Sequence, residues 1–457
     1  MSEWRFSREA VDCFRFVRAD IDATNGEVQL VYALDDGPEL VERIRVPGAP
    51  FCADLVNGSA CRAALDLLHG LAGVSYYKAA VPSRWSFESG TPDAETRAFL
   101  RLVYLKGLGE FAHRNGLDLS SKLVDEGAEA HPAVVQAPQK ADASLEAPRR
   151  ALVALGGGKD SLVTVESLRR LGVEQTLAWV GSAPLIRSCA EHTGLPGLQI
   201  ERRLAPELFD LNRAGAWNGH IPVTAINSAI LVLAAVLNGF DAVVFSNERS
   251  ASYGSLIPGS GEVNHQWSKG WLFERALRAQ LARHAVPVAY FSLLRPWSEL
   301  AVARQFARLD RYDAHFSSCN RNFHILGSRP VNRWCGACPK CRFVFLALAP
   351  FMPKPRLMGI FGRNLLDDVE QMSGFDALIE YRDHKPFECV GEASESRAAF
   401  ALLATQPAWR EDLLVARFHA EIAPQLTGAD LDMDALMLPH PLHAIPVPWW
   451  ERLHETG

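Results

Sequence analysis

One short stretch of the sequence restricts the possible folds more than any other. The apolar residues Ala151–Leu155 lead directly into Gly156, Gly157 and Gly158, and a helical pattern then runs from Ser161 to Gly172. A strand that enters a glycine turn and leaves it as a helix is the first half of a β–α–β unit. Because such units place consecutive strands parallel in one sheet, we expect an α/β fold.

Strand and helix patterns continue to alternate after this unit. Strands are predicted over Thr176–Val180, Asp241–Ser246 and Val286–Leu293, and helices over Pro184–His192, Thr224–Asn238 and Lys269–His284. This alternation predicts a doubly wound parallel sheet with helices on both of its faces.

The length of 457 residues is enough for two or three domains. We predict a small α+β N-terminal domain over residues 1–124, a flexible linker over 125–148, the α/β domain over 149–375 and a mostly helical C-terminal region over 376–457. The linker prediction rests on a run of Ala, Pro, Gln, Asp and Glu that has no periodicity.

Within the first of these regions, a turn signal at Asn25-Gly26 joins two apolar stretches. An antiparallel meander is predicted over Cys13–Asp20, Val28–Leu34 and Leu40–Val46, followed by helices over Ala60–Leu71 and Thr96–Arg114.

Charge and hydropathy exclude several classes of partner. The formal net charge is −6, whereas a broad nucleic-acid surface is normally basic. The longest strongly apolar run, Ala229–Leu237, is much shorter than a membrane span, and the N-terminus has no apolar signal core. We therefore expect a cytoplasmic protein that acts on a small molecule, with neither a nucleic acid nor a membrane as partner.

The glycine turn has the features of a phosphate-binding loop. Glycines let backbone N–H groups approach an anion, and the N-terminus of the following helix adds unpaired donors and partial positive charge. Lys159 offers a cation, Ser161 a hydroxyl, and Asp160 a carboxylate suited to Mg²⁺. The spacing is not that of a Walker A loop. The alternative is a plain glycine-rich turn with Ser161 as the helix cap.

This loop resembles the PP-loop of ATP pyrophosphatases, Ser-Gly-Gly-x-Asp-Ser, with Gly156 in place of the first serine. The resemblance implies the adenine nucleotide alpha hydrolase-like fold, ATP and Mg²⁺ as cofactors, and cleavage of ATP to AMP and pyrophosphate to activate a carboxylate. It also implies that Gly156, Gly157, Gly158, Lys159, Asp160 and Ser161 bind the nucleotide.

A cluster of cysteines predicts a metal site. Cys335, Cys338 and Cys341 are spaced at intervals of three residues, and Cys319 can complete a tetrahedron. Four thiolates around Zn²⁺ leave no open position for water, so the zinc is expected to be structural. The alternatives are an iron–sulfur cluster and unmetallated buried thiols. The set is similar to that of 7-cyano-7-deazaguanine synthase, another PP-loop enzyme.

Three further segments resemble the MurL family of bacterial UDP-N-acetylmuramoyl-L-alanyl-L-glutamate epimerases. They are Gly219–Ser228, Ser246–Ser252 and His384–Glu392, together with Val263-Asn264-His265-Gln266. The resemblance extends from the glycine loop to about residue 398. It implies ATP-dependent inversion of the terminal L-Glu of UDP-MurNAc-L-Ala-L-Glu to D-Glu, with release of AMP and pyrophosphate, in peptidoglycan synthesis.

Such an inversion needs acid–base groups with adjusted pKa values. Cys389 is the first candidate for the base, with His384 and Glu392 close in sequence. The alternative for Cys389 is a small, buried apolar residue.

Polar residues at strand ends and loops are the candidates for binding. Asn247, Glu248 and Arg249 directly follow a predicted strand, where ligands of parallel sheets bind. Glu248 suits Mg²⁺ and Arg249 a carboxylate or phosphate, although a solvated polar loop is the alternative. His220 and Lys269, and after them His265, are further candidates for substrate binding.

Two other functions remain open at this stage. One is a PP-loop ligase of the deazaguanine-synthase type, which would need an ammonia or sulfur donor. The other is a non-catalytic, zinc-stabilised nucleotide-binding scaffold, for which Asp160 and Ser161 would not be required.

Overall fold

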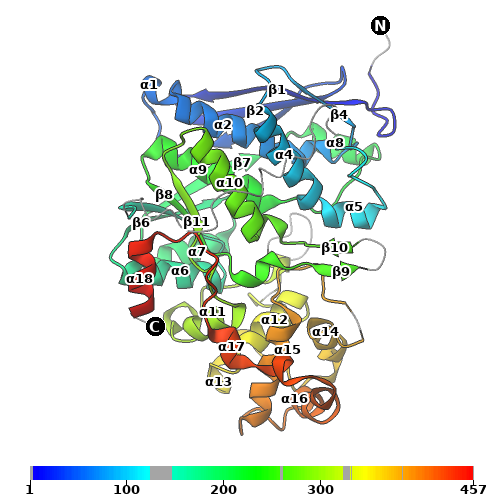
Figure 1. The fold of residues 1–457 in the computed structure, drawn as a ribbon, viewed down its shortest axis with the longest axis vertical. Coiled ribbons are helices and arrows are strands. Elements are labelled where there is room, and N and C mark those ends of the chain that lie inside the picture. The colour runs from blue at the N-terminus through cyan, green and yellow to red at the C-terminus, as the bar shows by residue number, and fades with distance from the viewer. Residues whose placement is uncertain are drawn as a thin grey trace.

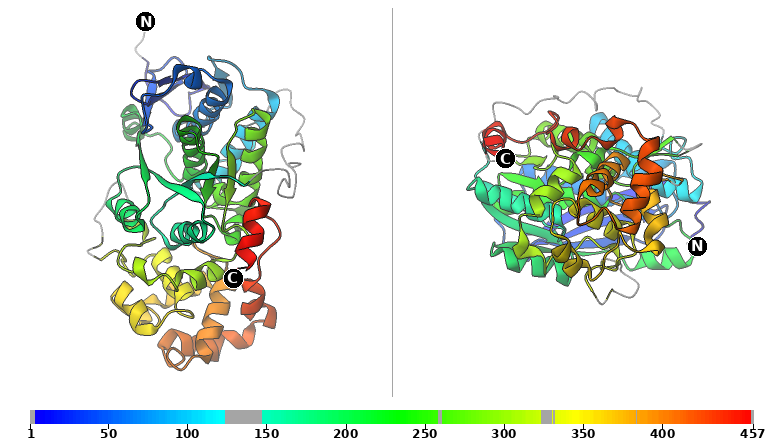
Figure 2. Two further views of the ribbon diagram at one scale, coloured as in Figure 1. Left: turned by 90° about the vertical axis from the view of Figure 1, so that its left-hand side faces the viewer. Right: turned by 90° about the horizontal axis from the view of Figure 1, so that it is seen from below.

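The computed structural model describes residues 4–123, 147–257, 261–322, 330, 332–382 and 384–455. Nearly all of the predicted linker lies outside these residues. Figures 1 and 2 show an elongated molecule with the N-terminal strands at one end and a helical C-terminal region at the other. None of the helices in the described parts combines the length and apolar character that crossing a membrane requires.

The central feature is a sheet of nine strands in the order β11-β8-β5-β6-β7-β3-β2-β1-β4. Its parallel part consists of β5 (Arg150–Ala154), β6 (Glu174–Val180), β7 (Gly197–Arg203), β8 (Ala242–Phe245) and β11 (Ala289–Ser292). The predicted α/β class is confirmed. Strand β7 was not predicted, because only Ile200 is fully buried in a segment that is otherwise polar or half-exposed.

The direction of winding determines where a ligand can bind. From β5 the chain goes to β6 and β7 on one side, and then returns to place β8 and β11 on the other. The loops that leave β5 and β8 therefore separate at the carboxyl edge of the sheet. In open parallel sheets this switch point is the usual ligand site.

Helices cover both faces of the parallel strands. Leu152 of β5 packs in the apolar cluster of one face, together with Ile226 and Ile230, whereas Val153 packs in the other cluster with Leu162 and Leu168. Between residues 159 and 306 the helices are α6 (Lys159–Arg170), α7 (Pro184–Thr193), α8 (Glu207–Arg213), α9 (Val223–Asn238), α10 (Trp271–Arg283) and α11 (Glu299–Phe306). Short elements between them are η2 (Arg249–Ser252), the hairpin of β9 (Ser255–Ile257) and β10 (Gly261–Val263), and η3 (Trp267–Lys269).

The N-terminal region forms the predicted antiparallel meander. Its strands are β1 (Cys13–Asp22), β2 (Glu27–Leu34) and β3 (Leu40–Arg45), and β4 (Arg84–Phe87) adds to β1 in parallel. The sequence did not indicate that β3 would pair antiparallel with β7 and so extend the central sheet. A buried ion pair reinforces this junction: Arg202 Nε lies 2.7 Å from Glu42 Oε1.

Helices of the N-terminal region pack on the meander and on α9. They are α1 (Ala53–Val56), α2 (Ser59–Ala72), α3 (Val74–Tyr77), α4 (Ala94–Gly107) and α5 (Gly109–Asn115). The single helix predicted over Thr96–Arg114 is divided at Leu108. At Gly107 a Cβ atom would lie 2.7 Å from the ring of Pro222, so the glycine allows close contact with the segment before α9. The break reorients α5.

The chain from residue 339 onward is mostly helical. It contains α12 (Pro339–Leu348), α13 (Lys354–Phe361), α14 (Met372–Leu378), α15 (Ala393–Thr405), α16 (Leu413–Arg417), α17 (Met433–Met437) and α18 (Val447–Glu455). Helix α18 returns to the parallel sheet, where Trp449 packs against Phe291 with ring centroids 5.6 Å apart.

The junction between β3 and β7 can be tested through its ion pair. Glu42 has no exposed surface, so Glu42→Ala would leave Arg202 buried without its partner. We expect a loss of about 3–5 kcal/mol in the free energy of unfolding. Urea denaturation measures this loss. The double variant Glu42→Leu/Arg202→Met should recover much of it, and an undiminished stability of Glu42→Ala would contradict the role of the pair.

Candidate active site

The glycine loop after β5 is shaped by two of its three glycines. Gly157 has a φ of +76°, and at Gly158 a Cβ atom would lie 2.6 Å from Ser318 Oγ. Gly156 faces open space, where a side chain would fit. Helix α6 begins at Lys159 directly after Gly158, so its first N–H groups are directed toward the loop.

A cavity of about 310 Å³ opens at this loop, within the size range of small-ligand pockets. It brings together seven of the residues predicted from the sequence: Gly156, Gly158, Asp160, Ser161, Asn247, Lys269 and Cys389. The phosphate-binding loop and the candidate acid–base residue therefore belong to one site, although 233 positions separate Gly156 from Cys389.

Two polar atoms beside this cavity have no partner in the described parts of the chain. Trp179 Nε1 and Ser246 Oγ are buried without a hydrogen bond, and both residues line the cavity. A buried polar atom without a partner costs about 1–3 kcal/mol. Polar groups of a bound ligand would remove that cost.

Charged side chains of both signs are buried under the loop. Lys159 is 1% exposed and pairs with Asp160 and Glu299, so its ammonium is directed into the protein rather than into the cavity. Lys340 lies 3.9 Å from Glu299. Burial works to raise the pKa of Asp160, but the ammonium groups of Lys159 and Lys340 lower it below its ordinary value.

Glu248 adds a second carboxylate to this group. It is 4% exposed, and none of the lysine or arginine side chains of the described residues forms an ion pair with it. Burial and the neighbouring Asp160 raise its pKa. A divalent cation between Asp160 and Glu248 would satisfy both carboxylates, which are ligands that Mg²⁺ prefers.

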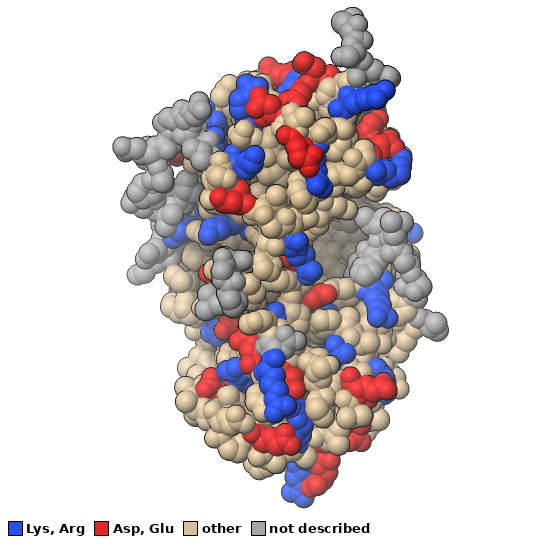
Figure 3. Space-filling model, turned by 90° about the vertical axis from the view of Figure 1, so that its right-hand side faces the viewer, with Lys and Arg blue, Asp and Glu red and all other residues tan. Residues whose placement is uncertain are grey.

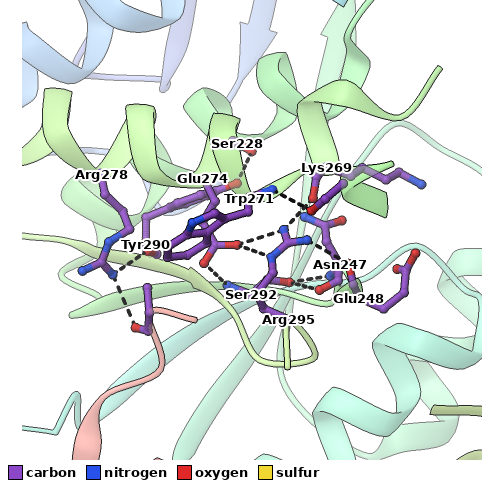
Figure 4. A network of polar contacts seen from close by, with 12 residues as sticks. Ser228, Asn247, Glu248, Lys269, Trp271, Glu274, Arg278, Tyr290, Ser292 and Arg295 are labelled. Carbon is purple, nitrogen blue, oxygen red and sulfur yellow. Dashed lines mark hydrogen bonds and ion pairs between the residues drawn. The ribbon is translucent and has the colours of Figure 1, made fainter. Parts of the chain in front are cut away.

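A buried arginine holds the backbone of this region in place (Figure 4). Arg295 donates to the carboxylate of Glu274 over 2.9 and 3.0 Å, to the carbonyl of Glu248 over 2.8 Å, and to the carbonyl of Lys269. Ser292 on β11 donates to the carbonyl of Asn247 over 2.8 Å. Asn247, Glu248 and Lys269 are thus fixed through their main chains, which leaves their side chains available to the site.

Cys389 is surrounded by cations. Lys269 Nζ lies 3.0 Å from its Sγ, Lys340 donates to its carbonyl, and the charge of His265 acts on the thiol. Burial alone would raise the pKa of this thiol, but Lys269, His265 and Lys340 outweigh it and lower the pKa to about 5. Cys389 is therefore a thiolate at neutral pH, and a thiolate can accept a proton from carbon.

Other predicted residues lie apart from the cavity. Arg249 donates to the carbonyl of Leu438 over 3.4 Å, at the C-terminal region. His384 is exposed, and Glu392 forms a capping box at the start of α15, where burial and Glu395 raise its pKa to about 7. His220 stacks on His265 with ring centroids 4.1 Å apart and does not line the cavity.

Several residues of the site were not foreseen as such. Lys340 lies between Cys338 and Cys341, Glu299 follows the cap of α11, and no recognisable motif marks either residue as part of a site. Ser317, Ser318 and Asn320 line the cavity from the segment around Cys319. In the sequence, the one sign that these residues belong to the site was their position next to Cys319, a predicted metal ligand.

The four predicted cysteines do come together. The Sγ atoms of Cys319, Cys335, Cys338 and Cys341 all lie within 4.8 Å of one another. Backbone N–H groups of Ala337 and Cys338 donate to Cys335 Sγ over 3.4 and 3.3 Å, and that of Cys341 to Cys338 Sγ over 3.4 Å. N–H donors stabilise thiolates, so this set fits a closed, structural zinc site.

This cysteine site is connected to the cavity at two points. Ser317 donates its N–H to the carbonyl of Gly157 over 3.0 Å, two residues before Cys319. Lys340 stands between Cys338 and Cys341 and reaches both Glu299 and Cys389. A metal held by the cysteines would therefore order one wall of the cavity.

Comparisons with known proteins agree with this arrangement. The family models described as the MurL N-terminal domain and the MurL C-terminal domain match residues 5–293 and 315–432. A protein of Xanthomonas oryzae pv. oryzae named UDP-N-acetyl-alpha-D-muramoyl-L-alanyl-L-glutamate epimerase is 62% identical over 98% of this chain and 98% of its own length. Proteins of the same name from a Micromonospora species and Salinispora tropica are each 45% identical, over 97% and 88% of this chain and 98% and 87% of their own lengths.

Metal analysis tests the cysteine site. Purified protein should contain about one zinc per chain, and stripping it with a chelator should lower the unfolding temperature, because metal binding contributes to folding. Binding of ligands in the cavity should weaken as well, since Ser317 and Lys340 lose their anchor. Cys52→Ser, at an exposed cysteine far in sequence from the cluster, is the control. An iron–sulfur absorption band, or protein without metal, would contradict a zinc site.

Proposed function

This chain belongs to the MurL family, and we propose that it is an ATP-dependent epimerase that converts the terminal L-Glu of UDP-MurNAc-L-Ala-L-Glu to D-Glu. Its place would be the cytoplasmic part of peptidoglycan synthesis. One observation carries the proposal: a glycine loop suited to phosphate and a thiolate suited to proton transfer line the same cavity.

The chemistry of the inversion explains why both the glycine loop and the thiolate are needed. The α-proton of a free glutamate is hard to remove, because the carbanion would share its charge with an adjacent carboxylate. Attack of that carboxylate on the α-phosphate of ATP forms an acyl-adenylate and releases pyrophosphate. The adenylate has lost the negative charge of the carboxylate, so its α-proton is far more acidic.

The loop and its surroundings suit the nucleotide. N–H groups at the start of α6 would bind phosphate, and Trp179 Nε1 and Ser246 Oγ would find partners on the rest of the nucleotide. Asp160 and Glu248 would hold Mg²⁺, which neutralises phosphate charge when bound. The cations of Lys269 and Lys340 line the same cavity and favour an anionic ligand.

Cys389 would act as the base. Its thiolate would take the α-proton, so that the C–H bond breaks, an S–H bond forms, and the electron pair moves toward the acyl carbonyl. Lys269, at 3.0 Å from Sγ, is on the same side and stabilises the thiolate. Return of a proton to the opposite face and hydrolysis of the adenylate would give the D-isomer and AMP.

The large substrate needs additional room. A second cavity, of about 660 Å³, is lined by residues of α5, β10 and η3 together with Trp271. Gly270 lines it, directly after Lys269 of the first cavity. Figure 3 shows that the face carrying α5 and the β9–β10 hairpin is hollowed near its middle. We assign the UDP-muramoyl part of the substrate to this second cavity.

Asp160→Asn tests the role of the loop. The variant keeps the shape of the side chain but removes a ligand charge, so formation of AMP and pyrophosphate should fall at least a hundredfold with the fold retained. Chromatography of the nucleotides measures it. Glu166→Gln, on the same helix α6 but outside the cavity, should be nearly as active as the wild type. A normal rate of AMP and pyrophosphate formation by Asp160→Asn would contradict the proposed cleavage of ATP.

Solvent exchange tests the proton transfer. In D₂O with ATP, Mg²⁺ and UDP-MurNAc-L-Ala-L-Glu, the D-Glu product should carry deuterium at the α-carbon, and exchange should require ATP. Mass spectrometry and chiral analysis give the result. ATP-dependent product without α-deuterium would rule out the mechanism.

Cys389→Ala should separate the two half-reactions. Adenylation precedes deprotonation, so the variant should still form AMP while returning L-Glu, with inversion reduced at least a hundredfold. The exposed Cys52→Ala is the matched control. Inversion at the normal rate in Cys389→Ala would remove this residue from the mechanism.

A further inference from the structure

A carboxylate of the N-terminal region is connected to Cys389 through a histidine. Glu110 stands at the start of α5, is 5% exposed, and accepts from Arg114 Nε over 2.6 Å with Oε1. Its other oxygen, Oε2, is hydrogen-bonded to Nδ1 of His265. The imidazole of His265 interacts electrostatically in turn with the thiol of Cys389. Because Nδ1 faces Glu110, Nε2 is the nitrogen that remains to face the thiol.

The surroundings favour a positively charged His265. Burial opposes the charge, but Cys389 and Glu110 outweigh it and raise the pKa of His265 to about 9. His220 stacks on the same ring, and burial together with His265 lowers the pKa of His220 to about 4. One imidazolium, not two, therefore lies between the carboxylate and the thiolate.

Glu110, His220 and His265 are also close enough to be considered as metal ligands. The hydrogen-bond pattern argues against this. Oε1 of Glu110 is engaged by the guanidinium of Arg114, and Oε2 shares a proton with His265 Nδ1. Both oxygens are thus occupied by donors, and the adjacent Arg114 disfavours a second cation.

We propose that Glu110 is a positioning residue of the catalytic centre, whose carboxylate orients His265 so that the imidazolium holds Cys389 as a thiolate. This inference rests on the proposed function. It gives the N-terminal region a direct part in the chemistry, because α5 supplies a carboxylate that the parallel sheet does not contain. Glu110 follows the break at Leu108 by two residues and contacts His265 from the first turn of α5.

The proton balance is simple. The imidazolium–thiolate pair exists before substrate binds, and the α-proton moves to Sγ as the C–H bond breaks. Afterward the S–H proton passes to water in the cavity, which restores the thiolate beside His265 and Lys269. His265 and Glu110 keep their protonation throughout.

Other charged groups face the same two residues. Lys269 and Lys340 lie beside Cys389, Glu388 faces both Cys389 and His265, and His220 lies against His265. None of them is altered in a Glu110 variant. A change in the pKa of the Cys389 thiol after substitution of Glu110 therefore reports on the contact of Glu110 with His265.

The test measures alkylation of Cys389 by iodoacetamide between pH 4 and 10, read from its peptide by mass spectrometry, in zinc-loaded full-length protein carrying Cys52→Ser. In Glu110→Gln and in His265→Gln the pH profile should move up by about one unit, so that the rate falls about fivefold at pH 5 and matches the unsubstituted protein at pH 8, because the thiolate fraction changes steeply only near and below the pKa of about 5. Glu110→Asp should be intermediate. Glu411→Gln, at an exposed carboxylate that pairs with Arg410 and lines neither cavity, is the control and should match the unsubstituted protein.

Three outcomes would overturn the proposal. They are an unchanged pH profile in Glu110→Gln, an equal loss of rate at every pH, which indicates a merely structural role, and loss of a bound metal ion beyond the zinc. If Glu110→Gln does not fold, His265→Gln and Glu110→Asp give the same decision.

Assays with substrate separate this inference from the proposed function. Glu110→Gln should keep AMP formation and its KM, while the acidic limb of the pH profile of α-deuterium incorporation moves up by about one unit. A wild type that incorporates no deuterium would reject the epimerase mechanism, whereas the alkylation result would still decide whether Glu110 controls Cys389.

Discussion

The rest of the site depends on the contacts that the guanidinium of Arg295 makes. This residue is only 2% exposed. It is paired with the equally buried Glu274 of α10, and its remaining donors go to the main-chain carbonyls of Glu248 and Lys269 (Figure 4). The end of β8 and the turn before α10 are therefore held by one side chain. Removing either charge would leave the other buried alone, which is far costlier than keeping the pair.

Rigidity at Arg295 makes the polar residues around it chemically useful. Glu248 and Lys269 are held through their backbones, so the carboxylate of Glu248 can stay near that of Asp160 and the ammonium of Lys269 can stay against the thiolate of Cys389. Sites that shift pKa values in this way need a scaffold that cannot relax. The cysteine cluster provides the opposite wall in the same manner, through Lys340 and Ser317.

The sequence predicted those parts of the structure that depend on local patterns. The strand, glycine loop and helix at Ala151–Arg170, the three meander strands and the cysteine set were all found, because apolar periodicity and spacing are visible in one dimension. The association of Cys389 with the glycine loop came from a family resemblance, since no local pattern links the two. Glu110 and Glu299 were missed, because a charged residue in a helix looks the same whether it faces solvent or a buried partner. The break in the helix at Leu108 was missed because the close contact of Gly107 with Pro222 joins residues that are far apart in the sequence.

The pairing of β3 with β7 determines whether this protein can be divided into fragments that are produced separately. The parallel strands end at β7, and the meander covers the edge that β7 would otherwise present. A fragment that begins at residue 147 would expose the backbone N–H and C=O groups of that strand, and the complementary fragment would expose those of β3. Open edges of this kind pair with other chains and lead to aggregation. The two segments must therefore be produced together, as one polypeptide or as co-expressed halves, for either of them to remain soluble.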